Sequence, residues 1–141
     1  MKSIILASGS PRRQELLRQV GVKFRVVTAD VDESPGRGRD ARSVCRRNAT
    51  AKAAQVAERF PKQTVLGADT LVHLGDEMFG KPSSLAEARR MLRRLSGHTH
   101  RVTTACALIQ GKRKRVFSVT THVTFRELSD RQIRNYIRAV Q

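Results

Sequence analysis

The chain opens with a short apolar run that leads directly into a capped helix, and this pattern restricts how the first segment can fold. Residues 4–7 read Ile-Ile-Leu-Ala, a run typical of a buried strand. Ser10 is then the expected N-cap and Pro11 the first helical residue, because the fixed φ of proline suits that position. We therefore expect a strand, a tight corner and a helix at the start of the chain.

Two arginines stand at the unfavourable end of this expected helix. Arg12 and Arg13 fall in its first turn, where the helix dipole disfavours a cation by roughly 0.3–1 kcal/mol each. A bound anion would reverse that sign, because backbone N–H groups, the hydroxyls of Ser8 and Ser10 and the guanidinium groups all donate to phosphate oxygens. Local physics leaves two alternatives equally open: a phosphate site, or an ordinary capped helix with solvated arginines.

Length and composition indicate one cytoplasmic domain spanning residues 1–141. The 141 residues suffice for one core, and no apolar run is long enough for a signal peptide or a membrane span. Cys45 and Cys106 lie far apart without metal-ligand spacing, so we expect both to be reduced core or near-core residues.

The formal net charge of +16 attracts polyanions in general and does not choose among them. Arg supplies 21 of the 28 basic residues, a skew that codon usage can produce as readily as selection for binding. Aromatic residues make up only 4%, so the stacking platforms of single-strand binders are scarce. Nucleic acid is therefore not an expected partner, and neither is a membrane.

An acidic segment follows a second expected strand, which spans residues 21–27. Asp30, Asp32 and Glu33 form the main acidic cluster of a basic chain, ahead of a Gly- and Arg-rich loop from Gly36 to Asp40 that we expect to be mobile. These carboxylates can either hold a divalent cation or form a solvated turn.

In the helix expected from Ala41 to Phe60, Lys52 lies inside the apolar arc. Its side chain either extends past the core or points at an anion.

A third apolar strand, from Thr64, delivers Asp69 and Thr70 and continues to Leu74. A buried unpaired carboxylate costs several kcal/mol, so Asp69 should be a metal ligand, a general base or half of an ion pair. Lys81, between Gly80 and Pro82, is a candidate phosphate contact, although its surroundings do not fit a P-loop. Beyond it we expect a helix over residues 85–95, a hairpin of residues 98–109 and 114–125, and a last helix capped by Ser129.

Several of these segments, taken in order, resemble the Maf-like proteins: SGSPRRQELL, VDES, the Lys52 helix, VLGADT, FGKP and MLRRLSGHTHRVTTA. The resemblance covers nearly the entire chain. It implies an α/β fold in which helices flank a mixed, twisted sheet, related to inosine triphosphate pyrophosphatases. It also implies hydrolysis of nucleoside triphosphates to the monophosphate and pyrophosphate with a divalent cation, Mg²⁺ or Mn²⁺, and commonly a homodimer.

The same resemblance assigns roles to individual residues. Asp69 would orient or deprotonate the attacking water and contact the metal, and Glu33 would be a second carboxylate on the metal side. Arg12 and Thr70 resemble the branch of the family that acts on dTTP and UTP, which favours pyrimidine nucleotides, modified ones included. The residues expected around the substrate are Ser8, Ser10, Arg12, Arg13, Lys52, Thr70 and Lys81.

The chain departs from the family pattern after its last helix. Family members continue into further segments and closing strands, so we expect a fold without the last strands and a pocket that lacks part of its wall. The alternative to an enzyme is a catalytically impaired remnant that binds nucleotides or nucleic acid through its basic charge.

Overall fold

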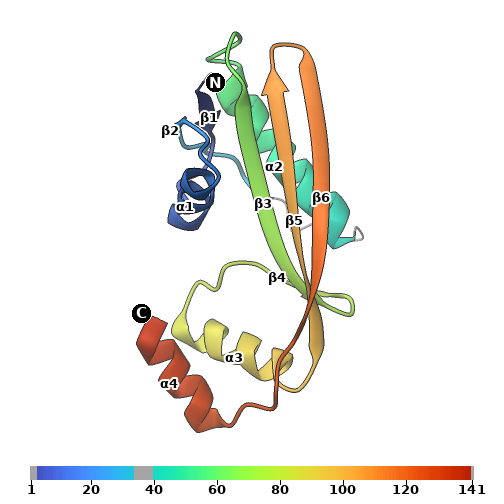
Figure 1. The fold of residues 1–141 in the computed structure, drawn as a ribbon. Coiled ribbons are helices and arrows are strands. Elements are labelled where there is room, and N and C mark those ends of the chain that lie inside the picture. The colour runs from blue at the N-terminus through green and yellow to red at the C-terminus, as the bar shows by residue number, and fades with distance from the viewer. Residues whose placement is uncertain (1–2, 34–39, 141) are drawn as a thin grey trace. The chain divides into compact units, whose positions relative to one another are not determined.

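The computed structural model describes residues 3–33 and 40–140. These residues form two compact units (Figure 1). The first combines the chain up to Thr70 with residues 104–119, and the second combines residues 71–103 with the chain from Thr120 onward. The strands β3 (Val65–Leu74), β5 (Thr99–Gln110) and β6 (Arg113–Thr124) each contribute residues to both units.

The sheet is mixed, as expected, with strand order β2-β1-β3-β5-β6 and β4 paired to β3. In the first unit β1 (Ile4–Leu6) runs parallel to β2 (Phe24–Val26) and to β3. Hydrogen bonds join Thr64 to Gln110 and Thr70 to Thr104, which requires β5 to run antiparallel to β3. Strand β1 ends at Leu6, opposite Leu66 of the longer β3, so Ser8 lies just beyond the end of β1 and Asp69 lies within β3, past its paired stretch with β1.

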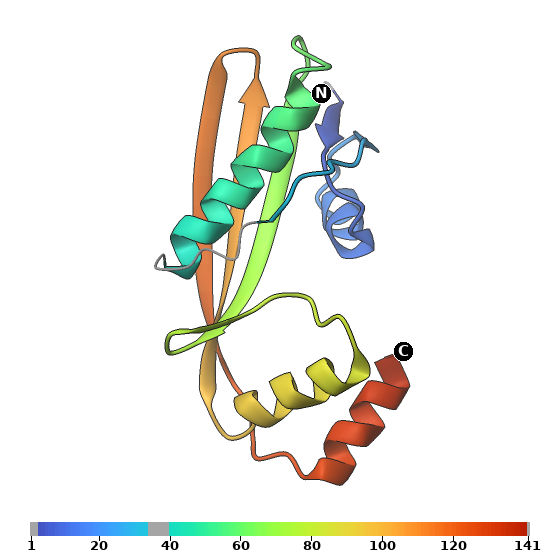
Figure 2. The same ribbon diagram turned by 180° about the vertical axis from the view of Figure 1, so that it is seen from behind.

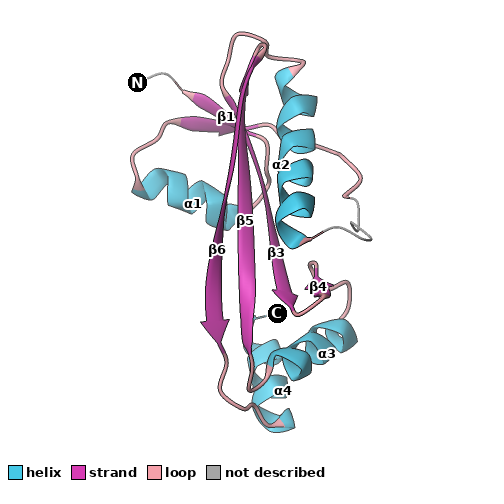
Figure 3. Ribbon diagram, turned by 90° about the vertical axis from the view of Figure 1, so that its right-hand side faces the viewer, coloured by secondary structure: helices cyan, strands magenta, loops and turns pink. Residues whose placement is uncertain are grey.

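Two helices lie on opposite sides of the first unit's strands (Figure 3). Helix α1 (Pro11–Gln19) connects β1 to β2, and α2 (Ala41–Ala57) crosses the other face (Figure 2). Close contact with α2 is possible because Gly67 has no side chain: a Cβ there would lie 2.5 Å from the carbonyl oxygen of Ala49. Small and apolar residues make up the buried stripe of α2, namely Ala41, Val44, Cys45, Ala49, Ala53, Val56 and Ala57.

The second unit is built on a short antiparallel pair and two helices. Strand β4 (Glu77–Phe79) pairs with the end of β3, and Gly75 makes the turn with a φ of 57°. Helices α3 (Leu85–Leu95) and α4 (Asp130–Val140) follow, and Leu95, Ile133 and Ile137 are buried. Ser129 caps α4 as expected, because its hydroxyl accepts from the N–H of Gln132 at 3.1 Å.

Most expected elements are confirmed, and the differences lie at their ends. The second strand begins only at Phe24, because the N–H groups of Gly21 and Val22 close the end of α1 by bonding to Arg18 and Leu17. Helix α2 ends at Ala57, and a tighter turn carries the chain to Pro61.

Strand β4 was not expected, because its three residues are too few for a visible alternation. Most of the loop expected from Gly36 to Asp40 lies outside the described residues, while Asp40 is the N-cap of α2. The single domain stays a prediction. No helix in the described part of the chain is long and apolar enough to cross a membrane.

Candidate active site

The corner between β1 and α1 is fastened by two serine hydroxyls. Ser10 caps the helix, since its Oγ accepts from the N–H of Arg13 at 3.3 Å. Ser8 Oγ accepts from the N–H of Ser10 at 3.2 Å and from Nη1 of Arg13 at 3.3 Å. The Arg13 guanidinium therefore lies over the corner, beside the amino end of the helix, where an anion would be stabilised.

Arg13 also connects this corner to the neighbouring strand. Its Nη2 donates to Thr70 Oγ1 at 3.0 Å, and the Thr70 hydroxyl shares a hydrogen bond of 3.0 Å with that of Thr104. Arg12, in contrast, is exposed. The structure thus separates two arginines that the sequence treated alike. Thr104 was not singled out from the sequence, because nothing in the alternating β5 segment distinguishes its hydroxyl from those around it.

Asp69 is buried, with 5% of its surface exposed, and donors reach both of its carboxylate oxygens. Asn48 Nδ2 donates to Oδ2 at 3.1 Å, and Lys52 Nζ lies 3.4 Å from Oδ1. Of the three roles open to this acid, half of an ion pair is the one realised in the contacts of the described residues. Asn48 was missed, although a signal existed: it precedes Lys52 by one helical turn on the apolar side of α2.

Lys52 joins Asp69 to the acidic segment. Its Nζ lies 2.6 Å from Glu33 Oε1 and 3.4 Å from the carbonyl oxygen of Ala68, and only 16% of its side chain is exposed. The sequence offered two alternatives, a lysine that extends past the core or one that faces an anion. The contacts favour the second, with carboxylates as the anions.

Apart from the exposed Arg12, the predicted site residues of the first unit fall into two clusters, each of which gains one residue that was not predicted, Thr104 or Asn48. The anion corner consists of Ser8, Ser10, Arg13, Thr70 and Thr104, and the acid cluster of Glu33, Asn48, Lys52 and Asp69. Asp69 and Thr70 are neighbours on β3, whose successive side chains point to opposite faces. Chain continuity within β3 therefore links the two clusters.

Lys81 belongs to the second unit and is described there. It is exposed, in the loop between β4 and α3, and lines a small hollow of about 90 Å³ with Met78 and Arg90.

The carboxylates of Glu33 and Asp69 suit a divalent cation that binds together with substrate phosphates better than a metal held by the protein alone. No group of three or more His, Cys, Asp and Glu side chains able to hold a metal occurs among the described residues. Glu33 and Asp69 both approach the Lys52 ammonium, so their oxygens converge on one positive charge. Mg²⁺ is typically held by one or two carboxylates together with substrate phosphates, and this pair of hard oxygen donors fits that pattern.

The thiol of Cys106, on the strand that carries Thr104 of the anion corner, is a weak nucleophile. Cys106 lies two residues after Thr104 on β5, hence on the same face, and is partly buried. Burial raises the pKa of the Cys106 thiol, an effect that the positive charge of Arg13 opposes only in part. The thiol stays protonated at neutral pH, so the chemistry of this edge depends on its carboxylates, hydroxyls and cations.

Solved structures share the fold at low sequence identity. The Staphylococcus aureus Ham1 protein superposes with a TM-score of 0.61 at 18% identity, covering 92% of this chain and 73% of that one. A HAM1 protein from Coxiella burnetii gives 0.52 at 20% identity, covering 86% and 72%. These similarities concern the fold alone and agree with the mixed α/β sheet expected from the sequence.

Sequence relatives are much closer. A protein named dTTP/UTP pyrophosphatase from Akkermansia muciniphila is 45% identical over 97% of this chain and 72% of its own length. Proteins with the same name from Symbiobacterium thermophilum and Myxococcus xanthus are 47% and 48% identical, over 97% and 94% of this chain and 71% and 67% of theirs. The model of the Maf-like proteins matches residues 3–141. The chain therefore belongs to the Maf-like protein family.

Proposed function

We propose that the chain is a nucleoside triphosphate pyrophosphatase that converts dTTP and UTP to the monophosphate and pyrophosphate. The names of the relatives support the reaction class. The observation that carries the proposal is the environment of Asp69: a buried carboxylate within β3, held by Asn48 and Lys52 and followed directly by Thr70, which Arg13 contacts.

In this proposal Asp69 accepts a hydrogen bond from the attacking water and removes its proton as the water approaches the α-phosphorus. The donors on both Asp69 oxygens hold the carboxylate in one orientation, so that its remaining lone pairs face the water. Arg13 and Lys52 stabilise the charge that grows on the phosphoryl oxygens, and the Ser8 and Ser10 hydroxyls orient them. The role of Lys81 as a phosphate contact, which the family resemblance implies, stays a prediction for the second unit.

Glu33 and Asp69 are the residues proposed to hold Mg²⁺ or Mn²⁺. The cation would supply charge neutralisation for the triphosphate and polarise the phosphoryl group. Lys52 would then exchange its contact with Glu33 for a phosphate oxygen, which a flexible lysine side chain can do at little cost.

The pyrimidine preference rests on Arg12 and Thr70, the two positions that resemble the dTTP and UTP branch of the family. Thr70 already contacts Arg13 and Thr104, so its hydroxyl has a fixed position at this edge. Modified pyrimidine nucleotides are further proposed substrates. The enzyme is further proposed to be cytoplasmic and to form a homodimer. Sedimentation velocity would test the oligomeric state.

The test compares pyrophosphate release from dTTP and UTP by the wild type, Asp69→Asn and Asp76→Asn, each with Mg²⁺ or Mn²⁺. Asp76 is exposed in the β3–β4 turn and undergoes the same chemical change outside the site. We expect Asp69→Asn to lose turnover by at least about 100-fold, the lower range for a general base, and Asp76→Asn to retain it.

A second candidate, a binding module without turnover, makes a different prediction. It requires that the wild type releases no pyrophosphate while dTTP still raises its melting temperature. Equal turnover by the wild type and Asp69→Asn would refute the role proposed for Asp69.

A further inference from the structure

The edge of the first unit opposite the candidate active site is strongly basic. At this edge the parallel strands begin, with Lys23 before β2 and Thr64 before β3, and the β5–β6 turn lies beside them. Gln110 ties the turn to the loop before β3, since its Oε1 accepts from Thr64 Oγ1 at 3.2 Å and its Nε2 donates to the Lys62 carbonyl at 3.1 Å. Two separate segments thus form one surface.

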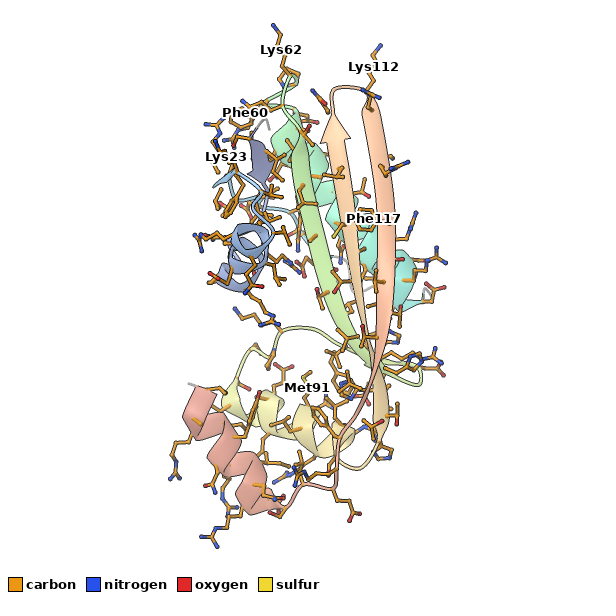
Figure 4. The ribbon with its side chains drawn as sticks, in the orientation of Figure 1. Lys23, Phe60, Lys62, Met91, Lys112 and Phe117 are labelled. Carbon is orange, nitrogen blue, oxygen red and sulfur yellow. The ribbon has the colours of Figure 1, made fainter. Side chains whose placement is uncertain are left out.

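We call this surface the basic edge. It consists of eight exposed basic residues: Lys23, Arg25, Arg59, Lys62, Lys112, Arg113, Lys114 and Arg115. Figure 4 shows Lys23, Lys62 and Lys112 at this end of the unit, together with Phe60. Residues 99–126, which include the whole hairpin, contain no Asp or Glu. None of the ion pairs between described residues involves a member of the basic edge.

Codon bias toward arginine does not account for this cluster. The chain has only 7 lysines, and 4 of them belong to the basic edge: Lys23, Lys62, Lys112 and Lys114. A general excess of arginine would spread over the surface and would not gather the scarce lysines at one end of a unit. The position of the charge, which composition alone does not reveal, therefore calls for a partner.

The edge is shaped as well as charged. A hollow of about 400 Å³ is lined by Thr64, Gln110 and the three consecutive basic residues 113–115. Beside it, the guanidinium of Arg25 lies 4.8 Å from the centre of the Phe60 ring and that of Arg59 lies 5.4 Å from it. Cation–π contacts hold these two charges in place without neutralising them.

We propose that the basic edge binds the phosphodiester backbone of nucleic acid, at a site separate from the one proposed for nucleotide hydrolysis. Lysine and arginine contacts to phosphates supply most of sequence-independent affinity, and they require no base stacking. The scarcity of aromatic residues, which argued against single-strand recognition, therefore does not bear on this surface. The tip of the hairpin, Gln110 to Arg113, also has no apolar side chain to insert into a bilayer, which favours nucleic acid over a lipid surface.

The test measures binding of a fluorescent DNA duplex of about 20 base pairs, and of RNA of equal length, as salt rises from about 50 to 200 mM. The edge variant combines Lys112→Ala, Lys114→Ala and Arg115→Ala. The matched control removes three exposed charges from α4, namely Arg131→Ala, Arg134→Ala and Arg138→Ala. Each phosphate contact contributes about 0.9 to the slope of log K against log salt, so the edge variant should lower the slope by roughly 2 to 3 and the control by less than one.

Three results would overturn the proposal: no binding by the wild type, equal loss in the two variants, or edge-dependent binding to vesicles of anionic lipid in place of nucleic acid. A variant with Lys112→Arg and Lys114→Arg keeps the charge and should keep the slope. Hydrolysis of dTTP, measured on the same samples, should be the same in the edge variant as in the wild type. Failure of the hydrolytic proposal would therefore not alter the binding result.

Discussion

A methyl group at Gly67 should both destabilise the protein and disturb the candidate active site. An added Cβ would lie 2.5 Å from the Ala49 carbonyl oxygen and 2.7 Å from the Ala53 nitrogen. Non-bonded atoms pack at about 3.5 Å, so α2 must retreat by about 1 Å in Gly67→Ala. Both obstructing atoms are backbone, and no side-chain rotation can relieve the clash.

The retreat of α2 has two costs that can be measured separately. Overpacking of this kind costs about 1–3 kcal/mol of unfolding free energy, and the gain from a stiffer unfolded chain recovers less than about 1 kcal/mol. Asn48 and Lys52 move with the helix, away from Asp69. Because a misplacement of about 1 Å can cost on the order of 100-fold in rate, kcat/KM for dTTP should fall by 10- to 100-fold in protein that is still folded.

Urea unfolding followed by circular dichroism gives the stability, and pyrophosphate release gives the rate. Gly80→Ala is the control, because a Cβ there meets no atom within 4 Å and the residue has no positive φ. It should shift the unfolding free energy by no more than about 0.5 kcal/mol. Wild-type stability and turnover in Gly67→Ala would refute the close packing on which the argument depends.

Three further predictions concern single side chains. Asn48→Leu keeps the size of the side chain but removes the donor to Asp69. Because a hydrogen bond to a charged group is worth about 1.5–3 kcal/mol, pyrophosphate release should slow by about 10- to 100-fold. An unchanged rate would contradict the role of this amide. Burial lowers the pKa of His100, so this imidazole binds a proton more readily in the unfolded chain than in the folded one. The free energy of unfolding therefore falls as the pH drops below about 6.5. The urea midpoints measured at about pH 7 and pH 5 should differ less in His100→Phe than in the wild type. The raised pKa of Cys106 predicts a slow reaction of its thiol with a disulfide reagent at neutral pH. Arg13→Ala removes the positive charge that lowers this pKa, so the reaction should become slower still. A faster reaction in Arg13→Ala would show that exposure of the thiol, and not the charge, controls its reaction rate.

The sequence predicts the first unit well where local signals agree with one another. Ser10 before Pro11 marks the start of α1 to the residue, because the cap and the proline give the same answer. The turn at Gly111 is equally clear, since two extended runs flank it. Strand β4 escapes prediction because Glu77 to Phe79 become a strand only by pairing with the end of β3, a contact that no local pattern encodes.

For the candidate site, the sequence identifies the costly residue but not its partners. Asp69 stands out because a carboxylate in an apolar strand requires compensation. Asn48 is equally buried, with 5% of its surface exposed. Burying a neutral amide costs less free energy than burying a charge, so an asparagine in a helix does not stand out in the sequence. Partners drawn from another element depend on how α2 crosses the sheet, which Gly67 determines through close packing.

The two arginines at the start of α1 show where local electrostatics stops being informative. Dipole arguments treat Arg12 and Arg13 alike, since both lie in the first turn and both are disfavoured there. Their side chains nevertheless leave the helix about 100° apart, so only Arg13 reaches Ser8 and Thr70. Bonded to two neutral hydroxyls, Arg13 keeps its full charge at a helix amino end, whereas Arg12 is exposed to solvent, which screens its charge. A phosphate at this corner should therefore depend mainly on Arg13, and Arg13→Ala should raise the KM for dTTP more than Arg12→Ala does.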